Sequence, residues 1–73
     1  MNYIEYISID ANVRFGKPCV KGTRITVYDV LTWLSEGITH LEIISDFPEL
    51  NEFSIRACIA FAADREQRYK IAS

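Results

Sequence analysis

The spacing of apolar and polar positions changes near Thr26. Before it, residues 3–10 read YIEYISID, in which apolar and polar side chains alternate as they do in a half-buried β-strand. This pattern predicts a short strand that ends at Asp10, with Ile7 and Ile9 on one face. Glycine and proline then interrupt the chain, which favours turns over a helix. We expect a second short strand at one of two places, Cys19–Val20 or Arg24–Ile25.

Beyond Thr26 the apolar positions follow the period of an α-helix. Thr26 is placed to cap the first helix, and Asp29 stands where a carboxylate favours the positive helix end. Gly37 is expected to stop this helix. The apolar stripe has the spacing i, i+3, i+4 and i+7 and consists of Val27, Val30, Leu31 and Leu34.

Two more helices follow, each with its own start signal. Thr39 and Glu42 form the S/T-x-x-E pattern of a capping box, which predicts the start of a short second helix. This helix is expected to end within DFPEL, residues 46–50, because proline biases the residue before it away from helical backbone. Asn51 is expected to cap a long third helix over residues 52–69.

These elements predict one mainly α domain over residues 1–73, a length that leaves no room for a second domain. Residues 26–69 are expected to form a tri-helical, helix-turn-helix-like (homeodomain-like) body. Residues 1–25 are expected to form a short N-terminal β segment with turns, and residues 70–73 a frayed tail. The alternative to the helix-turn-helix is a small helical bundle with no role in nucleic-acid binding.

The third helix is apolar on more than one side. Ile55, Ile59 and Ala62 make one stripe, and further apolar residues widen it. A domain this small buries only about 60% of its unfolded surface, so a second copy would add to its core. We therefore expect a homodimer, and the alternative is that the N-terminal strands fold over the helix. The expected dimer contacts are Ile7, Ile9, Cys58 and Phe61.

A basic segment stands out against the acidic balance of the chain. The formal net charge is −2, which gives no general attraction to nucleic acid or to anionic membranes. Residues 13–27, VRFGKPCVKGTRITV, nevertheless contain cations and no carboxylate. Binding to phosphates or to carboxylates is therefore expected to come from this local charge. The cations are Arg14, Lys17, Lys21 and Arg24.

Membrane, metal and enzyme functions find no support in the sequence. No apolar run approaches the length of about 18 residues that spans a membrane, and the N-terminus lacks the pattern of a signal peptide, so we expect a cytoplasmic protein. Cys19, Cys58 and His40 do not have the spacing of metal ligands, so no metal or other cofactor is expected. No nucleophile stands at a meaningful spacing from the histidine, so we expect no enzymatic activity.

The run GKPCVKGTRITVYDVLTWLSEGIT, followed by EIISDFPELNEFSIRACIAFAADRE, resembles the bacterial domain of unknown function family 433 over residues 7–68. The resemblance implies an antitoxin of the VapB-like class, which binds and silences a PIN-like nuclease toxin encoded beside it. Such antitoxins commonly bind their own operator DNA as dimers. The positions that match the pattern of the family are Gly16, Lys17, Pro18, Gly22, Thr23 and Arg24.

Two roles are open for the basic segment of a type II antitoxin. In the first, it clamps phosphates beside a recognition helix and assists autorepression of the operon. The DNA-binding residues would then be Lys17, Lys21, Arg24, Asn51, Ser54 and Arg56. In the second, the segment faces the carboxylate cluster that holds a divalent metal in a PIN-like nuclease. The toxin-binding residues would then be Arg14, Lys17, Arg24 and Trp33, of which Trp33 has core packing as its alternative.

Arg24 is the best candidate for insertion among carboxylates, because a guanidinium fits paired carboxylates better than an ammonium does. The alternative is a salt bridge from Arg24 to Asp10 or Asp29 that ties the N-terminal segment to the first helix. At the start of the third helix, Glu49 and Glu52 would repel phosphates. The other functions that stay open are a stand-alone dimeric DNA-binding transcriptional regulator and a protein-only interaction module.

Overall fold

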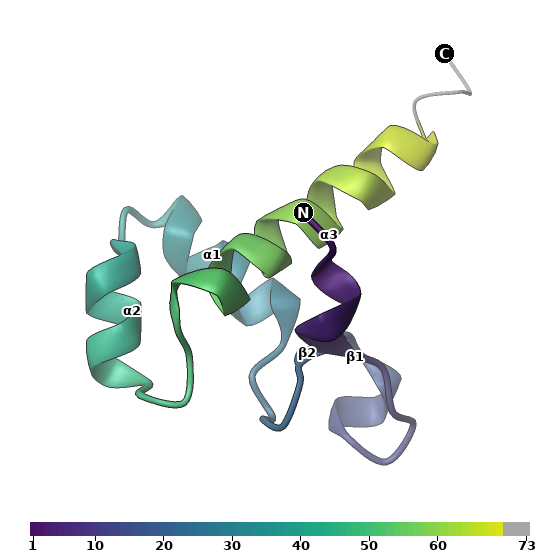
Figure 1. The fold of residues 1–73 in the computed structure, drawn as a ribbon, viewed down its shortest axis with the longest axis horizontal. Helices are drawn as coiled ribbons and strands as arrows, with labels where there is room; N and C mark the ends of the chain where they lie inside the picture. Colours follow the sequence, from purple (N-terminus) through teal and green to yellow (C-terminus); the bar gives the residue numbers. More distant parts are fainter. Residues whose placement is uncertain (70–73) are drawn as a thin grey trace.

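A computed structural model, which describes residues 1–69, has three helices preceded by a short antiparallel pair of strands (Figure 1). The mainly α fold with a short N-terminal β segment is therefore confirmed. The predicted frayed tail, residues 70–73, lies outside the described residues. No helix in the described part of the chain combines the length and apolar character needed to cross a bilayer. The elements are β1 (Ile7–Ser8), β2 (Cys19–Val20), α1 (Val27–Ser35), α2 (His40–Asp46) and α3 (Glu52–Tyr69).

Capping boxes form at the starts of both α1 and α2, which confirms the cap predicted at Thr26 and the capping box predicted at Thr39 and Glu42. The Thr26 hydroxyl accepts a hydrogen bond from the Asp29 N–H at 2.9 Å, and the Asp29 carboxylate accepts one from the Thr26 N–H at 3.1 Å. Thr39 and Glu42 make the same reciprocal pair at the start of α2, at 3.1 and 3.0 Å. Each pair satisfies N–H groups that have no partner within the helix. Local sequence therefore determines where these two helices begin.

Gly37 ends α1, as predicted, through a Schellman motif. Its φ of +88° is a left-handed conformation that glycine adopts without steric cost. The Gly37 N–H donates to the Leu34 carbonyl at 3.0 Å, and the Ile38 N–H donates to the Trp33 carbonyl at 3.1 Å. The chain leaves the axis of α1 here and enters α2 at His40.

The N-terminal segment contains less strand than the alternating pattern predicts. Tyr3–Glu5 form a 3₁₀ turn, and β1 has only two residues, which pair antiparallel with β2. Ile9 does not share the buried face of Ile7, because the Ile9 side chain is 66% exposed and the Ile7 side chain 8%. The prediction of one longer strand with both isoleucines on a common face was therefore wrong.

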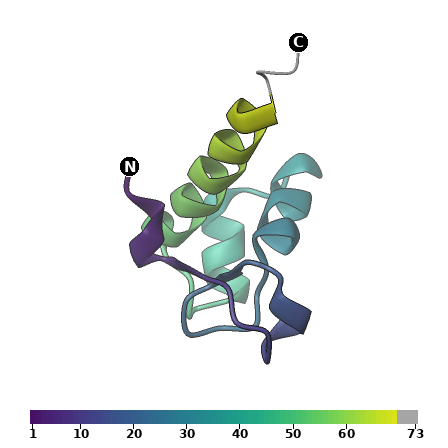
Figure 2. The same cartoon turned by 90° about the vertical axis from the view of Figure 1, so that its right-hand side faces the viewer.

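Aromatic contacts with α3 explain the short strand. The Tyr3 ring meets the Phe61 ring edge-on with 5.4 Å between the ring centres, and the Tyr3 hydroxyl donates to Asp64 Oδ2 at 2.5 Å. The Tyr6 ring stacks on Phe53 with 6.4 Å between the ring centres. Residues i and i+3 lie on one side of a 3₁₀ turn but on opposite sides of a strand, so only the turn brings both tyrosines to α3. The N-terminal segment thus lies along α3 (Figure 2).

The core lies between α1, α3 and the N-terminal segment. Val30 of α1 and Ala57 and Cys58 of α3 have no exposed surface, and Ile55 is 1% exposed. Ile59, which the sequence places in the same apolar stripe as Ile55, is 42% exposed in the single chain. The apolar stripe of α3 therefore extends beyond the part that the core covers. The core also includes Ile7, Val20, Ile25, Val27, Ile43 and Leu50.

Two substitutions on α3 test this assignment of the core. Ile55→Ala removes buried methyl groups and leaves a cavity, so we expect the free energy of unfolding to fall by about 2–5 kcal/mol. Ile59→Ala changes the same side chain at an exposed position, and we expect a change of about 0.5 kcal/mol. Urea unfolding followed by circular dichroism measures both values. Equal losses for the two variants would contradict the orientation of α3.

Candidate functional site

The basic segment forms a left-handed turn on the surface. Arg14, Phe15 and Gly16 have φ values of +49°, +60° and +80°, and the Gly16 and Lys17 N–H groups donate to the carbonyls of Val13 and Arg14. Of these residue types, only glycine adopts such a conformation readily. The Phe15 side chain points into solvent and is 96% exposed. We call the segment from Val13 to Lys17 the basic turn.

Arg14 holds the basic turn against the start of α1. Its Nη1 donates to the Arg24 carbonyl at 2.8 Å and lies 3.4 Å from Asp29 Oδ2. Asp29 is also the carboxylate of the α1 capping box, so one side chain caps the helix and pairs with the turn. The guanidinium of Arg14, which the toxin-binding hypothesis includes, is therefore engaged within the fold.

The other three cations of the segment are available to a partner. Lys17, Lys21 and Arg24 are exposed, and none of them forms an ion pair among the side chains of residues 1–67. The alternative salt bridge from Arg24 to a carboxylate is not formed, and Arg14 pairs with Asp29 in its place. These three positive charges are therefore not neutralised by the described part of the chain.

Two residues predicted to contact DNA cap α3 instead. The Asn51 side chain accepts a hydrogen bond from the Ser54 N–H at 2.9 Å, and the Ser54 hydroxyl accepts one from the Asn51 N–H at 2.9 Å. The same hydroxyl donates to the Asn51 carbonyl at 2.8 Å. Ser54 is only 3% exposed. The cap predicted at Asn51 is confirmed, and it engages Asn51 Oδ1 and the Ser54 hydroxyl, two of the polar atoms that base contacts would use.

Glu52 links α2 to α3 and forms an ion pair with Arg56, the third residue at the start of α3 that was predicted to bind DNA. His40 Nδ1 lies 2.9 and 3.0 Å from the two Glu52 carboxylate oxygens, and Arg56 Nε donates to the same carboxylate at 3.2 Å. The hydrogen bond from His40, with a smaller contribution from Arg56, lowers the pKa of Glu52 below its ordinary value. The exposed Arg56 is therefore paired with an acid at the start of α3.

The residues predicted to form a dimer interface are distributed between core and surface. Ile7 and Cys58 are 8% and 0% exposed and belong to the core of the single chain. Phe61 is partly buried and packs against Tyr3, whereas Ile9 is 66% exposed. Ile7 and Cys58 thus stabilise the single chain and present almost no surface to a second copy.

Trp33 is partly buried and packs against the core. Its ring stacks on Phe47 with 4.7 Å between the ring centres and 10° between the planes. This contact fastens the end of α1 to the residue that follows α2. Core packing, the alternative role for Trp33, therefore accounts for one face of its ring.

The two thiols are enclosed by the fold. Cys19 is 1% exposed, and its Sγ donates to the Lys17 carbonyl at 3.3 Å. Cys58 has no exposed surface, and burial raises the pKa of its thiol to about 12. Between residues 1 and 69, no group of three or more His, Cys, Asp or Glu side chains is placed to hold a metal ion.

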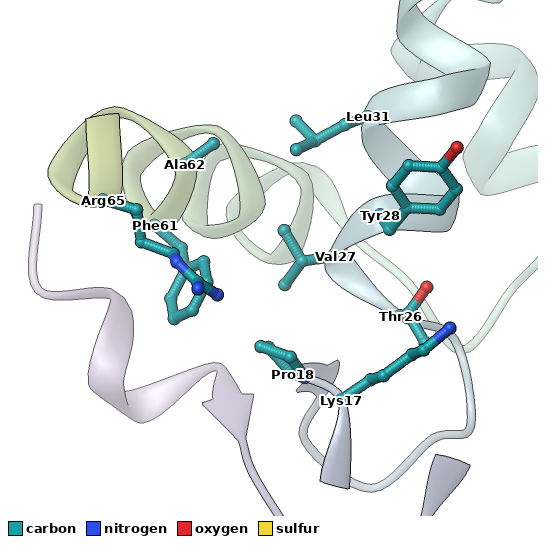
Figure 3. A pocket seen from close by; sticks show the side chains of 9 residues that line it. All are labelled: Lys17, Pro18, Thr26, Val27, Tyr28, Leu31, Phe61, Ala62 and Arg65. Atoms are coloured by element: carbon teal, nitrogen blue, oxygen red, sulfur yellow. The ribbon is translucent and has the colours of Figure 1, made fainter. Parts of the chain in front are cut away.

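An apolar groove that the sequence does not signal lies between α1 and the C-terminal half of α3 (Figure 3). Its volume is about 360 Å³. Apolar side chains of both helices line it, with Lys17 from the basic turn and Arg65 from α3 at its edge. The lining comes from three separate segments, with residues 17 and 18 from the first, 26–28 and 31 from the second, and 61, 62 and 65 from the third, so no local motif marks it. We call this feature the α1–α3 groove.

The fold defines a small three-helix domain with an N-terminal β segment, and comparisons assign it to a family. The family model "Protein of unknown function (DUF433)" matches residues 7–62, so the chain belongs to this family. The structure is similar to the crystal structure of a DUF433 member protein from Anabaena variabilis ATCC 29413, with a TM-score of 0.80 and 21% sequence identity. This similarity covers 93% of the present chain and 69% of the other, and at such identity it shows the fold alone. No curated protein matches the sequence.

The buried thiols predict low reactivity. In the folded protein we expect Cys19 and Cys58 to react with a disulfide reagent about a hundredfold more slowly than in the urea-unfolded chain, because each must first be exposed by opening of the structure. Absorbance of the released thiol measures both rates. Rapid reaction of one equivalent in native buffer would contradict the burial of one of the two cysteines.

The contacts of Glu52 predict a specific pH dependence. Because the folded-state pKa of Glu52 is lowered, its contribution to stability is fully present above its ordinary pKa of 4.5 and is lost as the pH falls through the folded-state value. Glu52→Gln lacks this titration. Between pH 7 and pH 3 we therefore expect wild type to lose more stability than the variant in thermal unfolding. Parallel curves for the two proteins would contradict the assignment.

Proposed function

We propose that this chain is a type II antitoxin, a non-enzymatic cytoplasmic protein that binds and inhibits a PIN-like nuclease toxin. The observation that carries the proposal is the basic turn, which holds the Phe15 ring in solvent beside the exposed Lys17. The resemblance to VapB-like antitoxins supports the same class of partner. In this proposal, the basic turn is the surface of the chain that would contact the nuclease.

The backbone of the basic turn is costly for the isolated chain. A residue with a Cβ loses about 1–2 kcal/mol in the left-handed conformation, and both Arg14 and Phe15 adopt it. A phenylalanine that is 96% exposed gains almost nothing from burial in return. Strain that is held at a surface position without local benefit is typical of binding sites. Binding of the Phe15 ring by a partner would supply that benefit.

The charge around Phe15 favours an acidic partner. Lys17, Lys21 and Arg24 are exposed and have no ion pair in the described chain. A PIN-like nuclease carries clustered carboxylates that hold a divalent metal, and a guanidinium pairs with carboxylates through two parallel hydrogen bonds. Aromatic residues and arginine are also the side chains that most often dominate binding energy at interfaces. Phe15 and Arg24 are therefore the proposed centre of the contact.

Operator binding is the second candidate, and the same exposed cations support it. Lys17, Lys21 and Arg24 would contact phosphates as well as carboxylates. Base contacts from the start of α3 have less support, because Asn51 and Ser54 form the helix cap. A stand-alone dimeric regulator and a protein-only interaction module remain the alternative functions. The homodimer stays a prediction.

Substitutions at the proposed centre test the antitoxin role. We expect Phe15→Ala and Arg24→Ala each to weaken binding to the purified nuclease encoded beside this chain by about 2 kcal/mol or more, measured by calorimetry. Inhibition of the nuclease activity should weaken in parallel. Leu41→Ala is the matched control, because Leu41 is a 79% exposed apolar residue on α2, and it should bind as wild type does. Absence of binding by the wild-type chain would refute the proposal.

A salt titration tests operator binding separately. If the exposed cations contact phosphates, the affinity for a duplex of the operon's own promoter should fall steeply with salt. Lys21→Ala should then reduce the slope of log K against log salt by about one. Affinity that is unchanged between low and moderate salt would remove DNA binding from the function of this chain.

A further inference from the structure

The α1–α3 groove combines an apolar lining with positive charge at its edge. Figure 3 shows Leu31 of α1 and Ala62 of α3 directed toward the space between the helices. Lys17 and Arg65 supply the charge, and no carboxylate lines the groove. The Arg65 guanidinium lies 5.5 Å from the centre of the Phe61 ring, a cation–π distance, and has no ion pair among the side chains of residues 1–67. A ligand that complements this surface has an apolar centre, which covers the apolar lining, and negative groups at its border, which face Lys17 and Arg65.

We infer that the α1–α3 groove receives an amphipathic helix of the partner nuclease, with an apolar face bordered by carboxylates. The inference rests on the proposed antitoxin function and names a second contact of the same partner. The carboxylates of this helix would pair with Lys17 and Arg65, while its apolar side chains would cover Leu31 and Ala62. This contact is separate from the one proposed for Phe15.

The shape of the groove favours a helix over a small molecule. Its volume of about 360 Å³ is at the lower end of the range for small-molecule pockets, which enclose most of the ligand surface. This groove is open to solvent, since Tyr28 at its margin is 73% exposed and Arg65 is also exposed. An open apolar channel between two helices is the surface that binds one face of an amphipathic helix.

Continuity with the basic turn favours the same partner for both sites. Lys17 ends the basic turn and also lines the groove, and Phe15 lies only two residues before it. Both surfaces carry positive charge and share Lys17. An acidic protein that binds Phe15 would therefore lie close to the groove. In contrast, the acidic start of α3, with Glu49 and Glu52, lies at the other end of that helix from Arg65. One acidic partner could therefore bind both the basic turn and the α1–α3 groove.

Adjacent alanines on α3 provide a matched test. Ala62→Glu places a carboxylate in the groove, and Ala63→Glu places the same side chain on the exposed surface one residue later. We expect Ala62→Glu and Arg65→Glu to weaken binding to the purified nuclease about tenfold or more, because both put negative charge against the carboxylates of its helix. Ala63→Glu should change the affinity by about twofold or less. Thermal unfolding verifies that each variant is folded.

Hydrogen exchange of the nuclease identifies the occupant. In the complex we expect protection of a helical segment that bears apolar and acidic residues, and this protection should be lost with Arg65→Glu while protection by the Phe15 surface persists. Protection of a non-helical segment alone would overturn the inference, as would wild-type affinity for Ala62→Glu and Arg65→Glu.

The possible failures are distinguishable. If Phe15→Ala weakens binding and the groove variants do not, the groove inference fails and the antitoxin function stands. If the wild-type chain does not bind the nuclease, both fail. Sedimentation of the chain alone tests a second copy as the occupant: a wild-type dimer that Ala62→Glu dissociates and Ala63→Glu does not would assign the groove to self-association and overturn the inference.

Discussion

The burial of the middle of α3 from two directions is the contact on which the rest of the structure depends. Val30 of α1 packs against the buried face that contains Ile55, and Tyr3 and Tyr6 of the N-terminal segment pack along the same helix. A domain this small needs both covers to exclude water from its core. The covers leave the last turns of α3 projecting beyond the other elements, as Figure 1 shows, so Arg65 remains accessible beside α1.

The helices could be predicted because their start signals are local in the sequence. The exposure of individual side chains could not, because it depends on contacts between residues that are distant in the sequence. Thr26, Thr39 and Asn51 act on N–H groups three residues away, so their caps can be recognised in the sequence alone. The apolar period indicated the apolar stripe on α3 but not how much of it the core covers, since Ile55 is buried and Ile59 is 42% exposed. The left-handed Phe15 had no signal, because non-glycine residues seldom adopt this conformation.

The described chain has exposed cations without an ion pair, although the net charge is −2. Lys17, Arg24 and Arg65 carry such charges, whereas Arg56 at the start of α3 is paired with Glu52, whose pKa is lowered chiefly by the hydrogen bond from His40. The sequence shows that the cations of the basic segment lie in the N-terminal part of the chain. It does not show which of them lack an ion pair, because Arg14 and not Arg24 pairs with Asp29 in the structure. In the proposed complex, these charges would attract an acidic partner before contact is made.

Asp29 has a wider consequence because it serves two elements with one carboxylate. It caps α1 and pairs with Arg14, so the position of the basic turn is tied to the start of the helix. The exposed residues that the turn presents, Phe15 and Lys17, take no part in this tie. In the proposed complex, substitutions at these exposed positions would therefore change the contact with the partner without disturbing the pair of Asp29 and Arg14 that positions the turn.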